Sequence, residues 1–346
     1  MKKIYYITAV FATLFLVGCG DGIDLPGVNV ETDLNKIPLP DNNVNLEQVE
    51  LKPSTEPMLH EGLHTEEDFQ RIRDKKAAGE EPWVSAYQLL VESQFSQKTA
   101  DTYPTEWIKR GISGDENYMN AARGATIVYQ QALRWKIEQD DEYAAKAVEN
   151  LNKWVQTCVG VTGNTNLSLA AGLYGYEFAI AGELLRDYGG WDRADFAAFQ
   201  NWLLKVFYPA NDDFLKRHHD TNALHYWANW CLCNIAAKMA IGIVTDRRDI
   251  YNEGIAHLQT GDTNGRLRRA IYHDYAPDYN FAQWQESGRD QGHTLMCVGL
   301  MGIICQLAWS QGDDFFAYDD NLFLRACEYA ACCNYTNETV PYTTYI

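Results

Sequence analysis

Residues 286–293, with the sequence ESGRDQGH, place acidic, basic and imidazole side chains directly before a long apolar stretch. In a helix, four of these side chains would project from one face at the spacing i, i+3, i+4 and i+7: Glu286, Arg289, Asp290 and His293. The apolar residues that follow predict that the rest of this helix lies in a core. We expect the polar face to open onto a ligand. The alternative is an ion-pair network that caps a core helix.

A second polar stretch, residues 218–230 (HHDTNALHYWANW), precedes another apolar segment. On a helix that spans residues 222–244, one face would carry Asn222, His225 and Asn229. A row of amides and an imidazole flanked by two tryptophans is uncommon in a core, so we expect His225 to be functional. The alternative is a core histidine whose hydrogen bonds are satisfied within the protein.

The third polar stretch is the sequence GNTN at residues 163–166, which precedes an apolar helix. Asn164 and Asn166 are candidates for ligand binding, although both residue types are also common helix N-caps. Further along the chain, residues 268–275 supply more side chains that can bind or transfer protons: Arg268, Arg269, Tyr272, His273 and Tyr275.

This combination of residues suits a carbohydrate that carries carboxylates. Aromatic rings stack on pyranose faces, while polar side chains pair with hydroxyl groups. In a uronate, an arginine, an asparagine or a protonated histidine can neutralise the carboxylate, which acidifies the proton on C5. A histidine or tyrosine then removes that proton, and a second such group protonates the departing O4, so the reaction requires no metal. Hydrolysis would instead need two carboxylates facing one glycosidic bond, for which Glu286, Asp290 and Asp220 are the candidates.

The charge of the chain restricts its partners. A formal net charge of −18 argues against nucleic acid, because phosphate binding needs a basic surface. An acidic polysaccharide could be held only where positive groups are concentrated. Such a concentration exists between residues 216 and 293, which include nine lysines and arginines and six of the eight histidines.

The cysteines give no sign of a metal centre. Apart from Cys19 there are eight, and none has the C-x-x-C spacing of a zinc or redox site. We therefore expect no metal and no cofactor. Most of these cysteines fall in apolar helical stretches, where a thiol is commonly a small buried side chain. Their even number would also allow disulfides, whose pairing the sequence cannot assign.

The N-terminus predicts export. A short basic region is followed by an apolar stretch too short to span a bilayer, and then by Leu16-Val17-Gly18-Cys19. These four residues resemble a bacterial lipobox, which implies that residues 1–19 are a lipoprotein signal peptide ending at a lipidated Cys19. The mature protein would then be held by its lipid to the outer membrane, in the periplasm or at the cell surface. Residues 20–57, rich in Asn, Asp, Pro and Gly, are predicted to be a flexible tether.

The remainder, residues 58–346, is predicted to be one all-α domain. Short loops and glycine-marked turns between apolar-periodic segments favour consecutive helical hairpins, and hence an incomplete α/α toroid. A short strand is expected within residues 269–275. The chain ends without a helix to cover the last hairpin, so we expect the C-terminus of this domain to be incomplete. Helices are expected at residues 65–78, 83–90, 117–138, 141–157, 166–188, 191–207, 222–244, 247–258, 287–311 and 321–335.

Three segments resemble bacterial polysaccharide lyases of the alginate lyase family. They begin at His60 (HEGLHTEEDFQRIRDKKAAGEEPW), at Thr221 (TNALHYWANW) and at Trp284 (WQESGRDQGHT), and the similarity extends over residues 58–341. The ESGRDQGH motif is the most specific part. The resemblance implies an incomplete α/α-barrel lyase that acts on a polyuronate such as alginate or glucuronan.

The resemblance also implies roles for individual residues. The family's Asn-His-Tyr-Trp signature corresponds to Asn222, His225, Tyr226 and Trp227, although Ala223 and Leu224 here separate Asn from His, and the family's arginine corresponds to Arg289. The base remains open among His225, His293, Tyr272 and Tyr275, and Asn164 or Asn166 could replace Asn222 beside the carboxylate. The predicted catalytic residues are therefore His225, Arg289, His293, Asn222 and Tyr275. The predicted substrate-binding residues are Asn164, Asn166, Tyr226, Trp227, Asn229, Arg269, Tyr272 and Glu286.

Two other functional classes fit part of the sequence. A non-catalytic glycan-binding surface lipoprotein would share the anchor, the helices and the aromatic residues, but would not need histidine and arginine on two neighbouring segments. An α/α-barrel glycoside hydrolase would use Glu286 and Asp290 as its acid and base.

Overall fold

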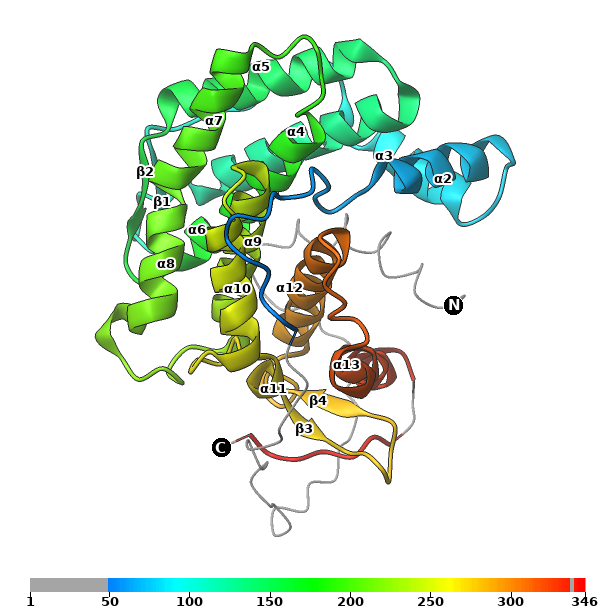
Figure 1. The fold of residues 1–346 in the computed structure, drawn as a ribbon, viewed down its shortest axis with the longest axis vertical. Coiled ribbons are helices and arrows are strands. Elements are labelled where there is room, and N and C mark those ends of the chain that lie inside the picture. Colours follow the sequence, from blue (N-terminus) through cyan, green and yellow to red (C-terminus); the bar gives the residue numbers. More distant parts are fainter. Residues whose placement is uncertain (1–48, 337–338, 346) are drawn as a thin grey trace.

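The computed structural model describes residues 49–336 and 339–345. The predicted signal peptide, Cys19 and most of the predicted tether lie outside these residues. Within them the chain is dominated by helices that follow one another as hairpins, and Figure 1 shows these hairpins along an open arc from α4 and α5 to α12 and α13. The predicted incomplete α/α toroid is confirmed.

Four helices form an inner row in which each packs against the next: α4 (Tyr118–Glu138), α6 (Leu167–Leu184), α9 (Ala228–Val244) and α12 (Gln291–Ser310). Nearly every residue of α6 and α9 is buried, because each of these helices has neighbours on both sides and an outer helix behind it. This explains why their sequences are apolar all round. The outer helices are α5 (Asp141–Thr157), α7 (Arg193–Val206), α8 (Tyr208–Arg217), α10 (Arg248–Thr260) and α13 (Tyr318–Tyr335).

The first hairpin precedes this row. It consists of α2 (Glu66–Ala77) and α3 (Trp83–Glu92), followed by the 3-10 turn η1 (Gln94–Ser96). Thr65 caps α2 as its sequence predicts: the Thr65 hydroxyl accepts from the Asp68 backbone N–H, and the Asp68 carboxylate accepts from the Thr65 N–H. The helix α8, by contrast, was not predicted.

Two small sheets complete the fold. β1 (Trp107–Arg110) and β2 (Gly160–Gly163) pair in parallel, and they lead into α4 and α6 respectively. This sheet was not predicted, since four-residue strands carry little pattern. β3 (Ile271–Asp274) confirms the strand expected near residue 271 and pairs antiparallel with β4 (Ala282–Trp284). It follows the single-turn helix α11 (Leu267–Ala270), and the 3-10 turn η2 (His218–Asp220) follows α8.

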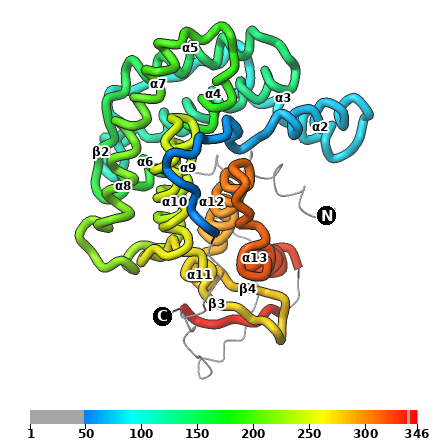
Figure 2. Tube along the Cα trace, in the orientation of Figure 1, coloured from blue at the N-terminus to red at the C-terminus, as the bar shows by residue number. Residues whose placement is uncertain are grey.

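Residues 49–57, the end of the predicted tether, hydrogen-bond to the helical domain. Val49 exchanges two hydrogen bonds with the Gln259 side chain of α10, and Arg248 donates to the Pro57 carbonyl at 2.8 Å. Leu59 then donates to the Gln311 side chain beyond the end of α12. Figure 2 shows this segment, in dark blue, beside α10 and near α12. These residues therefore lie against the domain.

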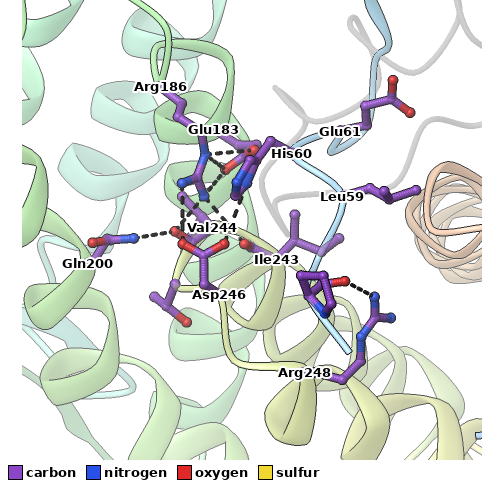
Figure 3. A network of polar contacts seen from close by, with 12 residues as sticks. Leu59, His60, Glu61, Glu183, Arg186, Gln200, Ile243, Val244, Asp246 and Arg248 are labelled. Carbon is purple, nitrogen blue, oxygen red and sulfur yellow. Dashed lines mark hydrogen bonds and ion pairs between the residues drawn. The ribbon is translucent and has the colours of Figure 1, made fainter. Parts of the chain in front are cut away.

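A cluster of polar contacts joins His60, which follows this segment, to the C-terminal ends of α6 and α9 (Figure 3). Arg186 pairs with Glu183 at 2.8 Å and donates to the Val244 carbonyl at 2.9 Å. His60 lies 3.5 Å from Asp246, which also contacts Arg186. Because this cluster caps the C-terminal ends of the inner helices, it lies at the end of the row opposite to the helix N-termini.

The core contains most of the cysteines. Five of the eight in the described residues are buried, and all eight are free thiols: Cys158, Cys231, Cys233, Cys297, Cys305, Cys327, Cys332 and Cys333. Among the described helices only α12 is long and apolar enough to cross a membrane. It packs between α9 and α13 with most of its surface buried, as a core helix does.

Candidate active site

The N-terminal turns of three inner helices lie together. Asn234 of α9 donates to the Ser168 carbonyl of α6 at 3.2 Å, and the Asn229 N–H at the start of α9 points at the Glu286 carboxylate, 3.4 Å away, before α12. The N-terminus of a helix is the positive end of its dipole and favours a negative charge nearby. The end of the inner row that carries all three polar stretches of the sequence is therefore suited to an acidic ligand.

The loop before α9 carries His225, and here a sequence prediction is wrong. The helix begins at Ala228, so Asn222 and His225 do not share a helical face with Asn229. The Asn222 side chain instead accepts from the Leu224 N–H at 2.8 Å, and the Asn222 carbonyl accepts from the His225 N–H at 2.9 Å. This turn keeps residues 221–227 out of the helix and leaves the His225 side chain exposed.

Tyr226 faces inward from the same loop and lies near three histidine rings, those of His218, His219 and His225. Its ring centre lies 4.9 Å from His225 and 5.7 Å from His219, both in edge-on orientation. His219 in turn approaches the Ser168 hydroxyl at the start of α6, with 3.0 Å between Nε2 and Oγ. These contacts connect the loop before α9 to the start of α6.

The sequence analysis did not select His219 as a site residue. Its backbone adopts a left-handed conformation with φ of 52°, as do its neighbours His218 and Asp220. Such conformations are uncommon for residues other than glycine and occur often at functional sites. The available signal was the HHD run itself, whose three polar residues precede the apolar helix α9. His218 points the other way, toward the Cys231 thiol, and burial lowers its pKa to about 4.

Arg289 lies against the indole of Trp227, with its guanidinium carbon 5.0 Å from the ring centre. It is bonded to Glu286, whose side chain has no exposed surface. Burial raises the pKa of Glu286, and the adjacent Arg289 opposes that rise. About a third of the Arg289 side chain remains exposed. Glu286 therefore fixes an arginine that is still open to a ligand, and its own carboxylate faces away from solvent.

The predicted helical face at residues 286–293 is also wrong in part. Residues 285–289 form turns, and α12 begins only at Gln291, after Asp290. The Asp290 carboxylate caps the helix by accepting from the Gly292 and His293 N–H groups at 2.7 and 3.2 Å, and its second oxygen lies 2.8 Å from the His293 ring. Turns preserve the i, i+3 proximity, so the ion pair between Glu286 and Arg289, which the sequence analysis gave as the alternative to a ligand-binding face, still forms.

Tyr272 and Tyr275 on the β3 side are held by Gln283 and the C-terminal segment. The Tyr275 hydroxyl donates to Gln283, the Gln283 amide donates to the Tyr272 hydroxyl at 3.1 Å, and Tyr272 donates to the Thr343 carbonyl. Burial raises the pKa of Tyr275 to about 12, and that of Tyr272 further. Both phenols therefore keep their protons near neutral pH.

The C-terminal segment adds an aromatic residue that the sequence analysis did not identify. The Tyr345 ring lies 5.7 Å from Trp227 and 5.2 Å from Tyr272. It thus joins the loop before α9 to β3 and completes an aromatic strip: Tyr226, Trp227, Tyr345 and Tyr272. No sequence pattern could show this contact, because Tyr345 lies more than seventy positions from either partner.

The remaining predicted binding residues differ in accessibility. Asn164 is exposed and Asn166 is half-buried before α6, where the Asn164 side chain accepts from the Asn166 N–H at 2.9 Å. Asn229 is buried, and its side-chain amide donates to the Met296 sulfur. Arg269 donates to the Asp262 carbonyl. The described residues include no group of three His, Cys, Asp or Glu side chains that could hold a metal.

A comparison with models of known protein families identifies the family of this chain. The model of the alginate lyase family matches residues 73–338, which is most of the chain. The chain belongs to the alginate lyase family. This match confirms the prediction that the chain is a polysaccharide lyase. No curated protein matches the chain.

Solved alginate lyases share the fold of this family member at low sequence identity. A variant of alginate lyase A1-III in complex with a tetrasaccharide is 14% identical, with a TM-score of 0.60 and coverage of 82% of each chain. Alginate lyase A1-III from Sphingomonas species A1 is 13% identical, with a TM-score of 0.55 and coverage of 79% of this chain and 78% of that chain. An alginate lyase from Bacteroides ovatus is 14% identical, with a TM-score of 0.54 and coverage of 78% and 82%.

Proposed function

We propose that this lyase cleaves a polyuronate, alginate or glucuronan, by β-elimination without a metal ion. The observation that carries the proposal is the placement of Arg289 on Trp227, two residues after the exposed His225. A carboxylate-binding group, an aromatic surface and a titratable imidazole are thereby brought to one end of the inner row. Solved members of the family were complexed with a tetrasaccharide, which supports a chain-like carbohydrate substrate.

In the proposed reaction, Arg289 binds the carboxylate of the sugar and stabilises the charge that develops when the C5 proton is removed. His225 is our first candidate for the base, because its ring is exposed. The C4–O4 bond then breaks, a C4–C5 double bond forms, and a protonated side chain returns a proton to O4. Tyr226, at the inner side of the same loop, is our candidate for that donor. Asn222 and His293 border the site and would contact the sugar.

The geometry does not favour the glycoside hydrolase alternative. Hydrolysis needs two carboxylates available to one bond. Glu286 is fully buried and bonded to Arg289, while Asp290 caps α12 and contacts His293. Burial would raise the pKa of Asp290, but its hydrogen bonds to His293 outweigh burial and lower the pKa. Both carboxylates therefore already have structural partners.

The test of this function is product analysis. Purified protein is incubated separately with alginate, glucuronan and a neutral polysaccharide, and the products are examined by ultraviolet absorbance and mass spectrometry. We expect oligosaccharides from one of the polyuronates that absorb through the new double bond and are lighter by one water than hydrolytic products. Saturated products would establish a hydrolase, and binding without products would establish a glycan-binding protein.

We further propose that the enzyme is lipid-anchored at the outer membrane, facing the periplasm or the cell surface. The basic start, the apolar stretch and the Leu16-Val17-Gly18-Cys19 motif support this location. Labelling of cells with a fatty-acid analogue should mark the wild-type protein and should not mark Cys19→Ala. Equal labelling of both proteins, or of neither, would contradict the anchor.

A further inference from the structure

Arg110 is a buried cation for which the described residues supply no anion. It is the last residue of β1, paired in register with Gly163 of β2, and only 8% of its surface is exposed. Its Nη1 atom is completely buried and has no hydrogen-bond partner. Its guanidinium carbon lies 4.7 Å from the centre of the Tyr118 ring, and its charge also acts on the buried thiol of Cys233. Among the described residues Arg110 forms no ion pair.

Other buried arginines of the chain have polar partners, so Arg110 is an exception. Arg134 binds Glu138, Arg325 binds Asp274, and Arg248 donates to the main-chain carbonyls of residues 56 and 57. Removing a guanidinium from water without such partners strongly destabilises the folded state. The fold maintains Arg110 despite this cost, which suggests that its partner comes from outside the chain.

The surroundings of Arg110 increase its need for an anion. β1 and β2 are parallel, so both end at the edge from which the chain continues toward α4 and α6. Tyr118 is the first residue of α4, so the guanidinium lies beside the positive end of that helix. An anion bound here would be stabilised both by Arg110 and by the N–H groups of the first turn.

Close packing of the two strand ends brings Arg110 to the polar segment before α6. Gly111 and Gly163 have φ of 82° and 149°, and neither could carry a side chain: a Cβ would meet the Asn164 side chain at Gly111 and the Arg110 carbonyl at Gly163. The exposed Asn164 and the half-buried Asn166 therefore adjoin the chain at Arg110. The amide N–H groups of Asn164 can donate to the hydroxyl groups of a sugar whose carboxylate Arg110 holds.

We propose that Arg110 binds the carboxylate of a second uronate unit, distinct from the unit held by Arg289. This rests on the proposed function and specifies its substrate as an oligomer with carboxylates on at least two sugars. Arg110 lies at the start of α4 and Arg289 before α12, with α6 and α9 between these helices in the inner row. Tyr118 orients the planar guanidinium, which can form two parallel hydrogen bonds to a carboxylate.

The test compares wild type with Arg110→Met and Arg110→Lys, and uses Arg248→Lys as a control at a buried arginine with structural partners. The melting temperature of each protein is measured without ligand, with a saturated mannuronate or glucuronate tetrasaccharide, and with the same tetrasaccharide after reduction of its carboxyl groups. KM and kcat are measured on the polymer cleaved by wild type.

We expect Arg110→Met to melt at or above the temperature of wild type without ligand, because an unpaired buried charge is removed. It should lose the stabilisation by tetrasaccharide, and its KM should rise about ten- to a hundredfold, the loss expected for hydrogen bonds to a charged group. Arg110→Lys should fold normally and show a smaller rise. Arg248→Lys should lower the melting temperature and leave KM unchanged. The carboxyl-reduced tetrasaccharide should not distinguish wild type from Arg110→Met.

Two results separate this inference from the proposed function. If wild type binds and cleaves a polyuronate while both Arg110 variants keep their KM and melt at lower temperature, Arg110 is structural and the inference is overturned alone. If wild type binds the tetrasaccharide through Arg110 but releases no unsaturated product, the proposed β-elimination is overturned and the assignment of Arg110 stands. If wild type neither binds the tetrasaccharide nor releases unsaturated product from a polyuronate, both are overturned.

Discussion

The guanidinium of Arg289 lies over the indole of Trp227, 5.0 Å from the ring centre, and forms an ion pair with the buried carboxylate of Glu286. This arrangement limits where the arginine can point. Arginine stacks on aromatic rings while its N–H groups stay free at the edges, and this leaves donors available for a carboxylate. Glu286, without exposed surface, then acts as a positioning residue.

Arg289→Lys should reduce kcat/KM about ten- to a hundredfold, although the positive charge is kept. Lysine cannot reproduce the planar fork of two hydrogen bonds to a carboxylate, and such charge-assisted bonds are the strong ones. Steady-state kinetics on the polyuronate that wild type cleaves measure the effect. Arg247→Lys is the matched control, because Arg247 forms an exposed ion pair with Asp249 before α10 and should leave kinetics unchanged.

The rival account makes Arg289 purely structural. Under that account, Glu286→Gln and Arg289→Lys would both lower the melting temperature, while the folded fraction of each variant kept the specific activity of wild type. This pattern would remove Arg289 from substrate binding.

His225→Ala should lower kcat by about a hundredfold to ten-thousandfold, the usual contribution of general acid–base catalysis, with little change in melting temperature. The side chain is exposed in a loop, so its removal creates no cavity. His60→Ala is the control: His60 is also exposed, but it contacts Asp246 at the opposite end of the inner helices. A near-normal kcat for His225→Ala would transfer the catalytic role to another residue of the site, with His219 next to be tested.

The architecture could be predicted because long apolar segments dominate it. α6 and α9 are buried on every side, and their sequences show this without any knowledge of their neighbours. The start of α9 could not be predicted. The carbonyls of Leu224 and Tyr226 accept from the Asn264 side chain at 3.0 and 2.9 Å, and this partner lies about forty positions away. This contact keeps the loop before α9 out of the helix, although the spacing of the polar residues in that loop fits a helix.

The candidate site likewise contains contacts that the sequence predicts and contacts that it does not predict. The Glu286–Arg289 pair depends on residues three positions apart, so it was predictable even though a turn replaces the expected helix. The contact of Tyr345 with Trp227 was not predictable, because it depends on the path of the whole chain. Arg110 was missed for another reason: a single arginine in a four-residue strand forms no pattern, and only its burial without a partner distinguishes it.

The dependence of kcat/KM on pH should distinguish the candidate bases. A base must be deprotonated, so the rate rises with pH up to its pKa and then levels off. A histidine base loses its proton well before a phenol does, so it predicts a plateau at a lower pH than a tyrosine base would give. Tyr275, whose pKa burial raises to about 12, would instead give a rate that still increases at about pH 10. We expect the plateau.

Tyr275→Phe provides the control for this profile. Because the Tyr275 hydroxyl bonds to Gln283 and Thr343, its removal should lower the melting temperature slightly and leave the shape of the profile unchanged. A profile that rises steadily in wild type and collapses in Tyr275→Phe would make Tyr275 the base.

The enzyme should retain its activity after treatment with EDTA. Lyases that neutralise a carboxylate with Ca²⁺ need a cluster of acidic oxygens at the site. Here the acidic side chains nearest to Arg289 are already engaged, since Glu286 is buried against Arg289 and Asp290 caps α12. Arg289 is therefore left to provide the positive charge. Activity of chelated enzyme, with and without added Ca²⁺ or Mg²⁺, is the measurement. Loss of activity in EDTA that returns with Ca²⁺ would transfer the neutralising role from Arg289 to a bound cation.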